Sequence, residues 1–393
     1  MTGALDGLKI LDLSRILAGP TCTQLLGDLG AEVIKVENPK TGGDDTRSWG
    51  PPFATDTDGQ PMNLSAYFMC ANRNKKSVSI DISTQSGQET VRQLAAECDV
   101  VIENFKPGSL AKFELDYEAM LIEFPHLVYC SISGFGQTGP NASKPGYDLM
   151  AQGYGGIMSL TGEPEGEPMK VAVGIADVMC GMYATTGILA ALRHRDKTGE
   201  GQHIDIALVD SQISWLINEG VNYLTSGYLP KRRGNGHPNI APYQVFESAD
   251  GHVIVAVGND SQFERFVTWL DKTELASDVR FATNPARLEN REALAEIIQT
   301  ILLEHKTDKI IDGLEALKVP VGPVNNLENV FNTGQVAARE MRISIETEKV
   351  GQGFVELIGN PLKLSKTPVS YRYPPPMVGE HNDEILGNPN ESE

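Results

Sequence analysis

The sequence predicts an α/β protein, in which a large Rossmann-like, doubly wound domain is joined to a smaller α+β domain. Short apolar runs of strand length alternate with helical patterns through residues 1–224. After residue 225 the composition changes, because a basic, glycine-rich connector leads into a hairpin pattern and then into helices. A chain of 393 residues is long enough for more than one domain.

The first elements predict a βαβ unit of a parallel sheet. Residues 8–13 read as a buried strand, residues 20–29 as a helix with Pro20 near its start, and residues 32–36 as a second strand. Such units bind ligands beyond the carboxyl ends of their strands, here near residues 14–20 and 37–47. The turn contains only Gly19 where a dinucleotide site has G-x-G-x-x-G, which argues against NAD.

The alternation of strands and helices continues to residue 224. Further strands are predicted at residues 77–82, 99–103, 127–133 and 202–208, and helices at residues 85–96, 177–192 and 210–224. Residues 134–139 match the dinucleotide motif after a strand. Because Pro140 and Pro145 follow, we expect no helix there to receive a pyrophosphate, and we interpret the match as accidental.

The smaller domain is predicted to span residues 225–325, and residues 326–393 are expected to return to the large domain. Its strands are predicted at residues 243–246 and 252–257, around an Asp250-Gly251 turn. Its helices are predicted at residues 262–270, 291–304 and 307–317.

Charge and cysteine content indicate the kind of partner. The 33 basic and 52 acidic residues give a net charge of −19, which repels nucleic acid and anionic membranes, so an anionic ligand needs a local basic cluster. The five cysteines form no C-x-x-C pair, and neither a signal peptide nor a transmembrane run is recognisable. We therefore expect a cytoplasmic protein without a nucleic-acid or membrane partner.

Asp177 lies in the apolar segment 171–183, between Gly174 and Gly181. An unpaired carboxylate is costly to bury, so it is either paired or present to react. The residues alone leave two readings open, a helix cap, which Asp favours, and a catalytic group. No zinc-protease, esterase or Walker A motif is present, and we expect no metal site.

Several ordered motifs resemble those of the class III CoA-transferases, the CaiB–BaiF family that includes formyl-CoA and carnitine CoA-transferases. These motifs are residues 5–13 with 18–20, 29–37, 72–77, 103–108, 133–136 and the Asp177 segment. The resemblance covers nearly the whole chain, down to residues 379–381. It implies two interlocked ring-like subunits in a homodimer, with a large domain built from both chain ends.

The resemblance also implies the chemistry. Asp177 would form an anhydride and then an aspartyl-CoA thioester, while CoA passes from an acyl-CoA donor to a carboxylic acid. CoA thioesters are then the substrates, and no tightly bound cofactor is expected. Residues 233–246 look like the succinyl-CoA:glutarate branch, which favours a succinyl or other dicarboxylyl donor.

By the same resemblance, eight residues are expected to contact CoA, namely Arg15, Ala18, Arg47, Asn72, Arg73, Lys75, Asn104 and Phe105. An active-site loop is expected at Gly258, Asn259, Asp260 and Gln262, with a single glycine where formyl-CoA transferases have a glycine-rich loop. Leu17 and Tyr147 are expected in the substrate pocket. Leu17 stands where formyl-CoA transferases place a glutamine against oxalate, which argues against formyl-CoA/oxalate exchange.

Two alternatives stay open. The family also contains α-methylacyl-CoA racemases, which move an α-proton with a histidine and an aspartate. Here Tyr147 stands near the position of that histidine, and a phenol is a poor base near neutral pH. The other alternative is a catalytically silent CoA-binding protein.

Overall fold

The computed structural model describes residues 3–387 and divides into two compact units. The first unit holds the chain up to Ile157, then Lys170–Ser226, and the chain from Gly334 onward. The second unit holds Met158–Met169 and Gly227–Thr333. The segment at Met158–Met169 was not expected in the smaller domain. It is tied there by backbone, since Gly234 N–H donates to the Gly162 carbonyl at 3.0 Å.

The first unit is built on a six-stranded parallel sheet, as the sequence predicts, in the order β5-β2-β1-β6-β7-β8. Its strands are β1 (Lys9–Asp12), β2 (Glu32–Glu37), β5 (Lys75–Ser79), β6 (Val100–Glu103), β7 (Val128–Ser133) and β8 (Gln202–Ala207). Strand β5 begins two residues before the expected start at residue 77, because Lys75 already pairs with Val33 of β2. Nearly continuous apolar runs suit strands that are covered on both faces.

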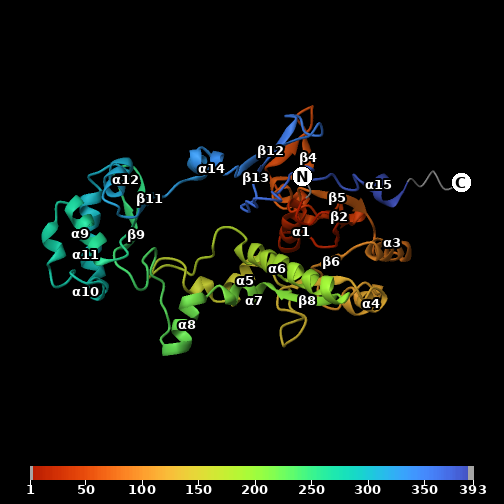
Figure 1. Cartoon of the computed structure of the whole chain (residues 1–393), viewed down its shortest axis with the longest axis horizontal. Coiled ribbons are helices and arrows are strands. Elements are labelled where there is room, and N and C mark those ends of the chain that lie inside the picture. Colours follow the sequence, from red (N-terminus) through yellow and green to blue (C-terminus); the bar gives the residue numbers. More distant parts are fainter. Residues whose placement is uncertain (1–2, 388–393) are drawn as a thin grey trace. The chain divides into compact units, whose positions relative to one another are not determined.

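Helices cover both faces of this sheet (Figure 1). The α-helices of the first unit are α1 (Ala18–Asp28), α2 (Ala66–Met69), α3 (Gln85–Ala96), α4 (Tyr117–Glu123), α5 (Asp148–Tyr154), α6 (Ile175–Thr198), α7 (Leu208–Ser214), α8 (Ile217–Ser226), α14 (Gly334–Ala338) and α15 (Asn382–Leu386). One core joins the sheet to α1, α5, α6 and α7, and another joins the opposite face to α3 and α4. The predicted helix at residues 210–224 is in fact two helices, α7 and α8, which are separated at Trp215 and Leu216.

Helix α6 is the longest in the described chain and the one that carries Asp177. Ala176, Cys180, Ala184 and Ile188 recur at helical spacing and face the core. The helix is long and apolar enough to cross a membrane by length and composition, a test that core helices of soluble proteins also pass. The helix extends beyond the expected end near Leu192 and ends at Thr198. The next residue, Gly199, adopts a left-handed φ of +79° that stops the helix.

Two antiparallel hairpins far apart in the sequence share a core within the first unit. These are β3 (Phe53–Thr55) with β4 (Pro61–Ser65), and β12 (Arg342–Glu346) with β13 (Phe354–Ile358). Leu64 and Phe68 pack there with Val355 and Leu357. The C-terminal segment is thus part of the first unit.

The second unit has a three-stranded antiparallel sheet, in the order β11-β10-β9. Its elements are β9 (Tyr243–Glu247), β10 (His252–Ala256), β11 (Val321–Pro323), α9 (Asp260–Trp269), α10 (Asn284–Glu289), α11 (Arg291–Leu302), α12 (Thr307–Ala316) and α13 (Leu327–Phe331). Phe263, Phe266, Ile298 and Leu314 are fully buried in its core. The expected hairpin and the three expected helices are all present.

Candidate active site

The site lies where the winding of the sheet reverses. Strand β1 comes first in the sequence and pairs with β2 on one side and β6 on the other, so the chain builds the sheet outward in both directions. Ligands of open α/β sheets bind at such a switch point, beyond the carboxyl ends of the strands. Two cavities open there, and Arg15 and Phe105 line both.

The first cavity has a volume of about 200 Å³ and contains Asp177. Its wall comes from the turn after β1, the turn after β6, the end of β7, the segment before α5, and the start of α6. The lining residues include Arg15, Ile16, Leu17, Ala18, Asn104, Phe105, Lys106, Lys144, Tyr147 and Asp177. Every one of these residues belongs to the first unit.

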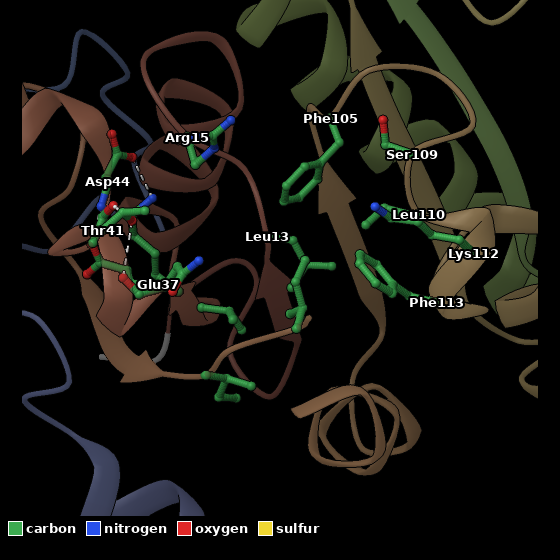
Figure 2. A pocket seen from close by; sticks show the side chains of 16 residues that line it. Leu13, Arg15, Glu37, Thr41, Asp44, Phe105, Ser109, Leu110, Lys112 and Phe113 are labelled. Atoms are coloured by element: carbon green, nitrogen blue, oxygen red, sulfur yellow. Dashed lines mark hydrogen bonds and ion pairs between the residues drawn. The ribbon is translucent and has the colours of Figure 1, made fainter. Parts of the chain in front are cut away.

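The second cavity measures about 300 Å³ and lies on the α3/α4 side of the switch point. Figure 2 shows Arg15, Thr41, Glu37 and Asp44 on one wall and Phe105, Leu110, Lys112 and Phe113 on the other. The guanidinium of Arg15 lies 5.5 Å from the centre of the Phe105 ring. This cavity therefore combines apolar walls with the cations Arg15 and Lys112 and with two carboxylates, Glu37 and Asp44, which are neutralised by Arg47 and Lys35.

Asp177 occupies the first turn of α6, and it is not the helix cap. Gly174 is the N-cap residue, and the Ala176 N–H donates to the Asp148 carboxylate at 2.8 Å. Asp148 also accepts from Gln152 at 2.7 Å, so its own position is fixed. Another carboxylate thus takes the capping role that the sequence allowed for Asp177.

The Asp177 carboxylate is half-buried and has no hydrogen bond or counter-charge from the side chains that the structure describes. Burial, followed by the repulsion of Asp148, raises its pKa from 3.8 to about 7. A poorly solvated carboxylate of this kind is a better nucleophile when ionised than a hydrated one. Perturbed carboxylates in cavities are candidates for reacting groups.

Tyr67 is a neighbour of Asp177 that the sequence did not predict. The repulsion of Asp177 is the largest electrostatic cause, after burial, that raises the pKa of Tyr67 to about 12, so the phenol stays neutral. The rings of Trp49 and Tyr67 pack edge to face with centres 5.1 Å apart. No motif in the sequence marks this pair, because the residues lie in a loop and in the short helix α2.

Six of the residues expected at the site line the cavity of Asp177. They are Arg15, Leu17, Ala18, Asn104, Phe105 and Tyr147. Asn104 and Arg15 exchange two hydrogen bonds, since the Arg15 N–H donates to Oδ1 at 2.9 Å and Nδ2 donates to the Arg15 carbonyl at 2.7 Å. These bonds join the turn after β1 to the turn after β6 and bring the two motifs together.

The other four expected CoA contacts, Arg47, Asn72, Arg73 and Lys75, lie outside both cavities. Each is almost fully buried and has internal partners. Arg47 pairs with Glu37 at 2.6 Å, Arg73 pairs with Asp28 at 2.6 Å, and Lys75 bonds to Asp12 and to the Asn72 side chain. Removing Arg47, Arg73 or Lys75 would leave a buried carboxylate without its partner, so these three cations stabilise the fold. The contact of the four residues with CoA stays a prediction.

The expected loop at residues 258–262 is largely the start of a helix. Asn259 caps α9 by accepting from the Gln262 N–H at 2.9 Å, and the Gly258 N–H donates to the Gln262 side chain at 2.6 Å. Asp260 forms an ion pair with Arg287 at 2.7 Å. These contacts, all within the second unit, hold in place the segment that was expected to be an active-site loop with a single glycine.

Lys144 and Lys112 line the cavities without having been expected as ligand contacts, and Lys106, a basic residue just after a predicted strand, lines the cavity of Asp177 as well. Lys106 and Lys144 face the cavity of Asp177, and Lys112 faces the other. The signal available in the sequence was weak, because Lys144 lies in an irregular segment between prolines and Lys112 in a short 3-10 turn. Within residues 3–387, no group of three or more His, Cys, Asp and Glu side chains has the arrangement of a metal site.

Comparison with known proteins agrees with this geometry. The family model described as CoA-transferase family III matches residues 5–382. A succinate–glutarate CoA-transferase of Agrobacterium fabrum is 47% identical over 97% of this chain and 94% of its own length. The human succinyl-CoA:glutarate CoA-transferase is 42% identical, over 97% of this chain and 85% of its own length.

A solved structure shows the same fold. A CAIB/BAIF family protein from Brucella suis matches with a TM-score of 0.89 and 48% identity, over 98% of this chain and 99% of its own. The sequence match and the fold match both extend over nearly the whole chain. The protein therefore belongs to CoA-transferase family III.

Proposed function

We propose that this CoA-transferase moves CoA from a dicarboxylyl-CoA donor, such as succinyl-CoA, to a second carboxylic acid through covalent intermediates on Asp177. The observation that carries the proposal is the unpaired carboxylate of Asp177 in a cavity at the switch point of the sheet. A free carboxylate held out of bulk water can attack a thioester, whereas a paired one cannot easily leave its partner.

The first half of the reaction loads CoA onto the enzyme. An Asp177 carboxylate oxygen attacks the thioester carbonyl carbon, the C–S bond breaks, and CoA leaves as a thiolate from the new mixed anhydride. The thiolate then attacks the aspartyl carbonyl of the anhydride. The donor acid leaves as a carboxylate, and Asp177 is left as an aspartyl-CoA thioester.

The second half repeats these steps in reverse order. The acceptor carboxylate attacks the aspartyl-CoA carbonyl, forming a second anhydride and releasing the thiolate. The thiolate attacks the acceptor's acyl carbon, so that the new acyl-CoA forms and the Asp177 carboxylate is restored. Each step exchanges one acyl bond for another, and no redox partner is needed.

The cations around the two cavities suit the phosphates of CoA. Arg15, Lys106 and Lys144 surround the cavity of Asp177, and Lys112 lies in the adjoining cavity with Phe105 and Phe113. In a chain of charge −19, such a local cluster is the feature that can hold an anion. We place the nucleotide end of CoA in the larger cavity and the thioester beside Asp177.

The choice of donor and acceptor follows from the relatives. The two relatives named above are described as succinate–glutarate and succinyl-CoA:glutarate CoA-transferases. Leu17 is buried in the cavity wall beside Asp177, and it offers no hydrogen bond to a small diacid such as oxalate. We therefore propose succinyl-CoA as donor and, as acceptor, a dicarboxylate longer than oxalate, such as glutarate.

We also propose that the enzyme is a homodimer. Helix α8 has no buried residue, and its apolar side chains Val221 and Leu224 are 60% and 81% exposed. Met150 on α5 and Met182 on α6 are exposed as well. Exposed apolar side chains on several helices of one domain indicate a protein interface.

Trapping of the intermediate tests the reaction. Succinyl-CoA should make the enzyme sensitive to hydroxylamine, because both the anhydride and the aspartyl-CoA thioester react with it, and mass spectrometry should find the hydroxamate on Asp177. Asp177→Asn should lower kcat by at least about 10³-fold, because the amide is a poor nucleophile. Retained exchange in this variant, or inactivation by hydroxylamine without acyl-CoA, would contradict the proposal.

A substrate panel separates the remaining alternatives. Succinyl-, acetyl- and oxalyl-CoA are offered with mono- and dicarboxylates, and we expect the highest kcat/KM with succinyl-CoA and a five-carbon dicarboxylate. Deuterium exchange at the α-carbon without an acceptor acid would instead indicate a racemase. CoA binding without turnover of any pair would indicate a silent binder.

A further inference from the structure

The turn between β1 and α1 contains a strained residue at the edge of the active site. Ile16 has a φ of +72°, in the left-handed region that glycine adopts readily and that β-branched residues avoid. Ile16 lines the cavity of Asp177, and its neighbours Arg15 and Leu17 do so too. Strained backbone persists only where the surroundings hold it, and it is found at functional sites.

A buried carboxylate holds Ile16 in this conformation. The Ile16 N–H lies 3.2 Å from both carboxylate oxygens of Asp44, whose side chain is almost fully buried. Asp44 is in turn fixed by the Lys35 ammonium at 2.9 Å, and Lys35 is only 1% exposed. The hydrogen bonds of Asp44 to a charged partner and to the backbone make it a rigid acceptor.

The Lys35 ammonium also binds the turn between β1 and α1 directly. Lys35 Nζ donates to the Ser14 carbonyl at 2.9 Å, so one buried ion pair contacts the chain on both sides of Arg15. On the other side of the crevice, Asn104 exchanges two hydrogen bonds with the Arg15 backbone. Three consecutive residues, Ser14 to Ile16, are therefore held by side chains from β2, from the segment that follows β2 and from the turn after β6.

The direction of the chain after Arg15 depends on this turn. A positive φ at Ile16 leads directly into Leu17 and the start of α1 at Ala18, and both residues form part of the cavity wall. If Ile16 relaxed to a negative φ, the path between Arg15 and Leu17 would change. Arg15 would then leave its place between the two cavities, where Figure 2 shows it beside Asp44.

We infer that Asp44, held by Lys35, is a positioning residue for CoA transfer, because it keeps Ile16 in a left-handed conformation and so sets Arg15 and Leu17 against the substrate. Asp44 acts through the backbone of Ile16. The inference rests on the proposed transfer reaction, because Arg15 and Leu17 are placed there against CoA and the acyl group.

A glycine rescue tests the inference. Asp44→Ala should lower kcat/KM for the acyl-CoA at least tenfold, because the Ile16 N–H loses its acceptor, and it should lower the Tm, since Lys35 loses its counter-charge. Adding Ile16→Gly to this variant should raise kcat/KM at least threefold over the single variant, because glycine enters the left-handed region without strain. Adding Ile16→Ala should recover nothing, because alanine keeps the Cβ that disfavours this conformation. The Tm deficit should persist in both double variants.

The variant with Ile16→Ala is the matched control, since it differs from glycine only by the Cβ. Equal kcat/KM of the two double variants would overturn the inference. A kcat/KM that falls and rises with the Tm across the wild-type, single and double variants would overturn it as well. If Asp44→Ala does not fold, the two changes at Ile16 are compared with Asp44 intact. There the glycine variant should have the higher Tm, and a higher Tm for alanine would contradict strain at Ile16. A wild-type enzyme without transferase activity would refute the proposed reaction instead.

Discussion

At the scale of single residues, Asp177 shows how a neighbour can prepare a reacting group. Asp148 accepts the Ala176 N–H, and it also repels the Asp177 carboxylate. With burial, this repulsion raises the pKa of Asp177 to about 7. The carboxylate that caps the helix therefore also weakens the preference of Asp177 for its charged form.

This arrangement predicts the pH dependence. The ionised form of Asp177 is the nucleophile, so kcat/KM should fall as the pH drops below about 7, to roughly a tenth of its plateau at pH 6. Asp148→Asn removes the like charge and leaves an oxygen to accept the Ala176 N–H. The acid limb of the profile should therefore move to lower pH, and it should stay above the ordinary range because burial remains.

The measurement is the full pH profile of kcat/KM for the acyl-CoA in both proteins. Gln152→Ala is the control, since it removes the partner of Asp148 without removing its charge. An acid limb that stays at the same pH in Asp148→Asn would show that Asp148 does not influence Asp177.

The charged residues near the strand ends were harder to assign from the sequence. Arg15 and Lys75 both look like ligand contacts there, but Lys75 is buried against Asp12 and Arg15 is exposed at the cavities. Both cations have an acidic partner, Asp45 for Arg15 and Asp12 for Lys75, but the first ion pair is exposed to solvent and the second is fully buried. A motif therefore indicates that a cation matters, and the folded environment decides whether it binds a ligand or stabilises the fold.

At the scale of secondary-structure elements, the packing of α1 against α6 sets the position of Asp177. Gly181 lies one turn after Asp177 on α6, and a Cβ there would come within 2.6 Å of the Ala18 carbonyl of α1. Ala18 and Asp177 line the same cavity. The absence of a side chain at Gly181 thus lets the two helices approach where the substrate is expected to bind.

Gly181→Ala should therefore lower both stability and activity. We expect a loss of about 1–3 kcal/mol in the free energy of unfolding, because the clash is with backbone, and a lower kcat as Ala18 shifts. Gly187→Ala on the same helix is the control, since its Cβ would approach only the Ile204 side chain at 3.3 Å. Its stability should change by less than about 1 kcal/mol. Chemical denaturation and steady-state kinetics of both variants check this, and equal effects would refute it.

At the scale of the whole molecule, the exposed apolar side chains of α5, α6 and α8 predict a dimer in solution. Light scattering after size exclusion should give about twice the 42.6 kDa of one chain at micromolar concentration. Leu224→Glu adds a charge at an 81% exposed position of α8 and should weaken association. A stable monomer of the wild-type protein would contradict the homodimer.

The sequence by itself determined the parallel α/β class, most of the strands and long helices, and Asp177 as the reacting group to test. These features depend on local apolar periodicity and on ordered motifs, which are read along the chain. Only the tertiary structure showed Asp148 as the cap, Tyr67 near Asp177, and Arg47 and Arg73 as buried ion pairs. The reason is physical, because burial and charge pairing depend on residues that meet only after folding, and local patterns do not encode which carboxylate a cation meets.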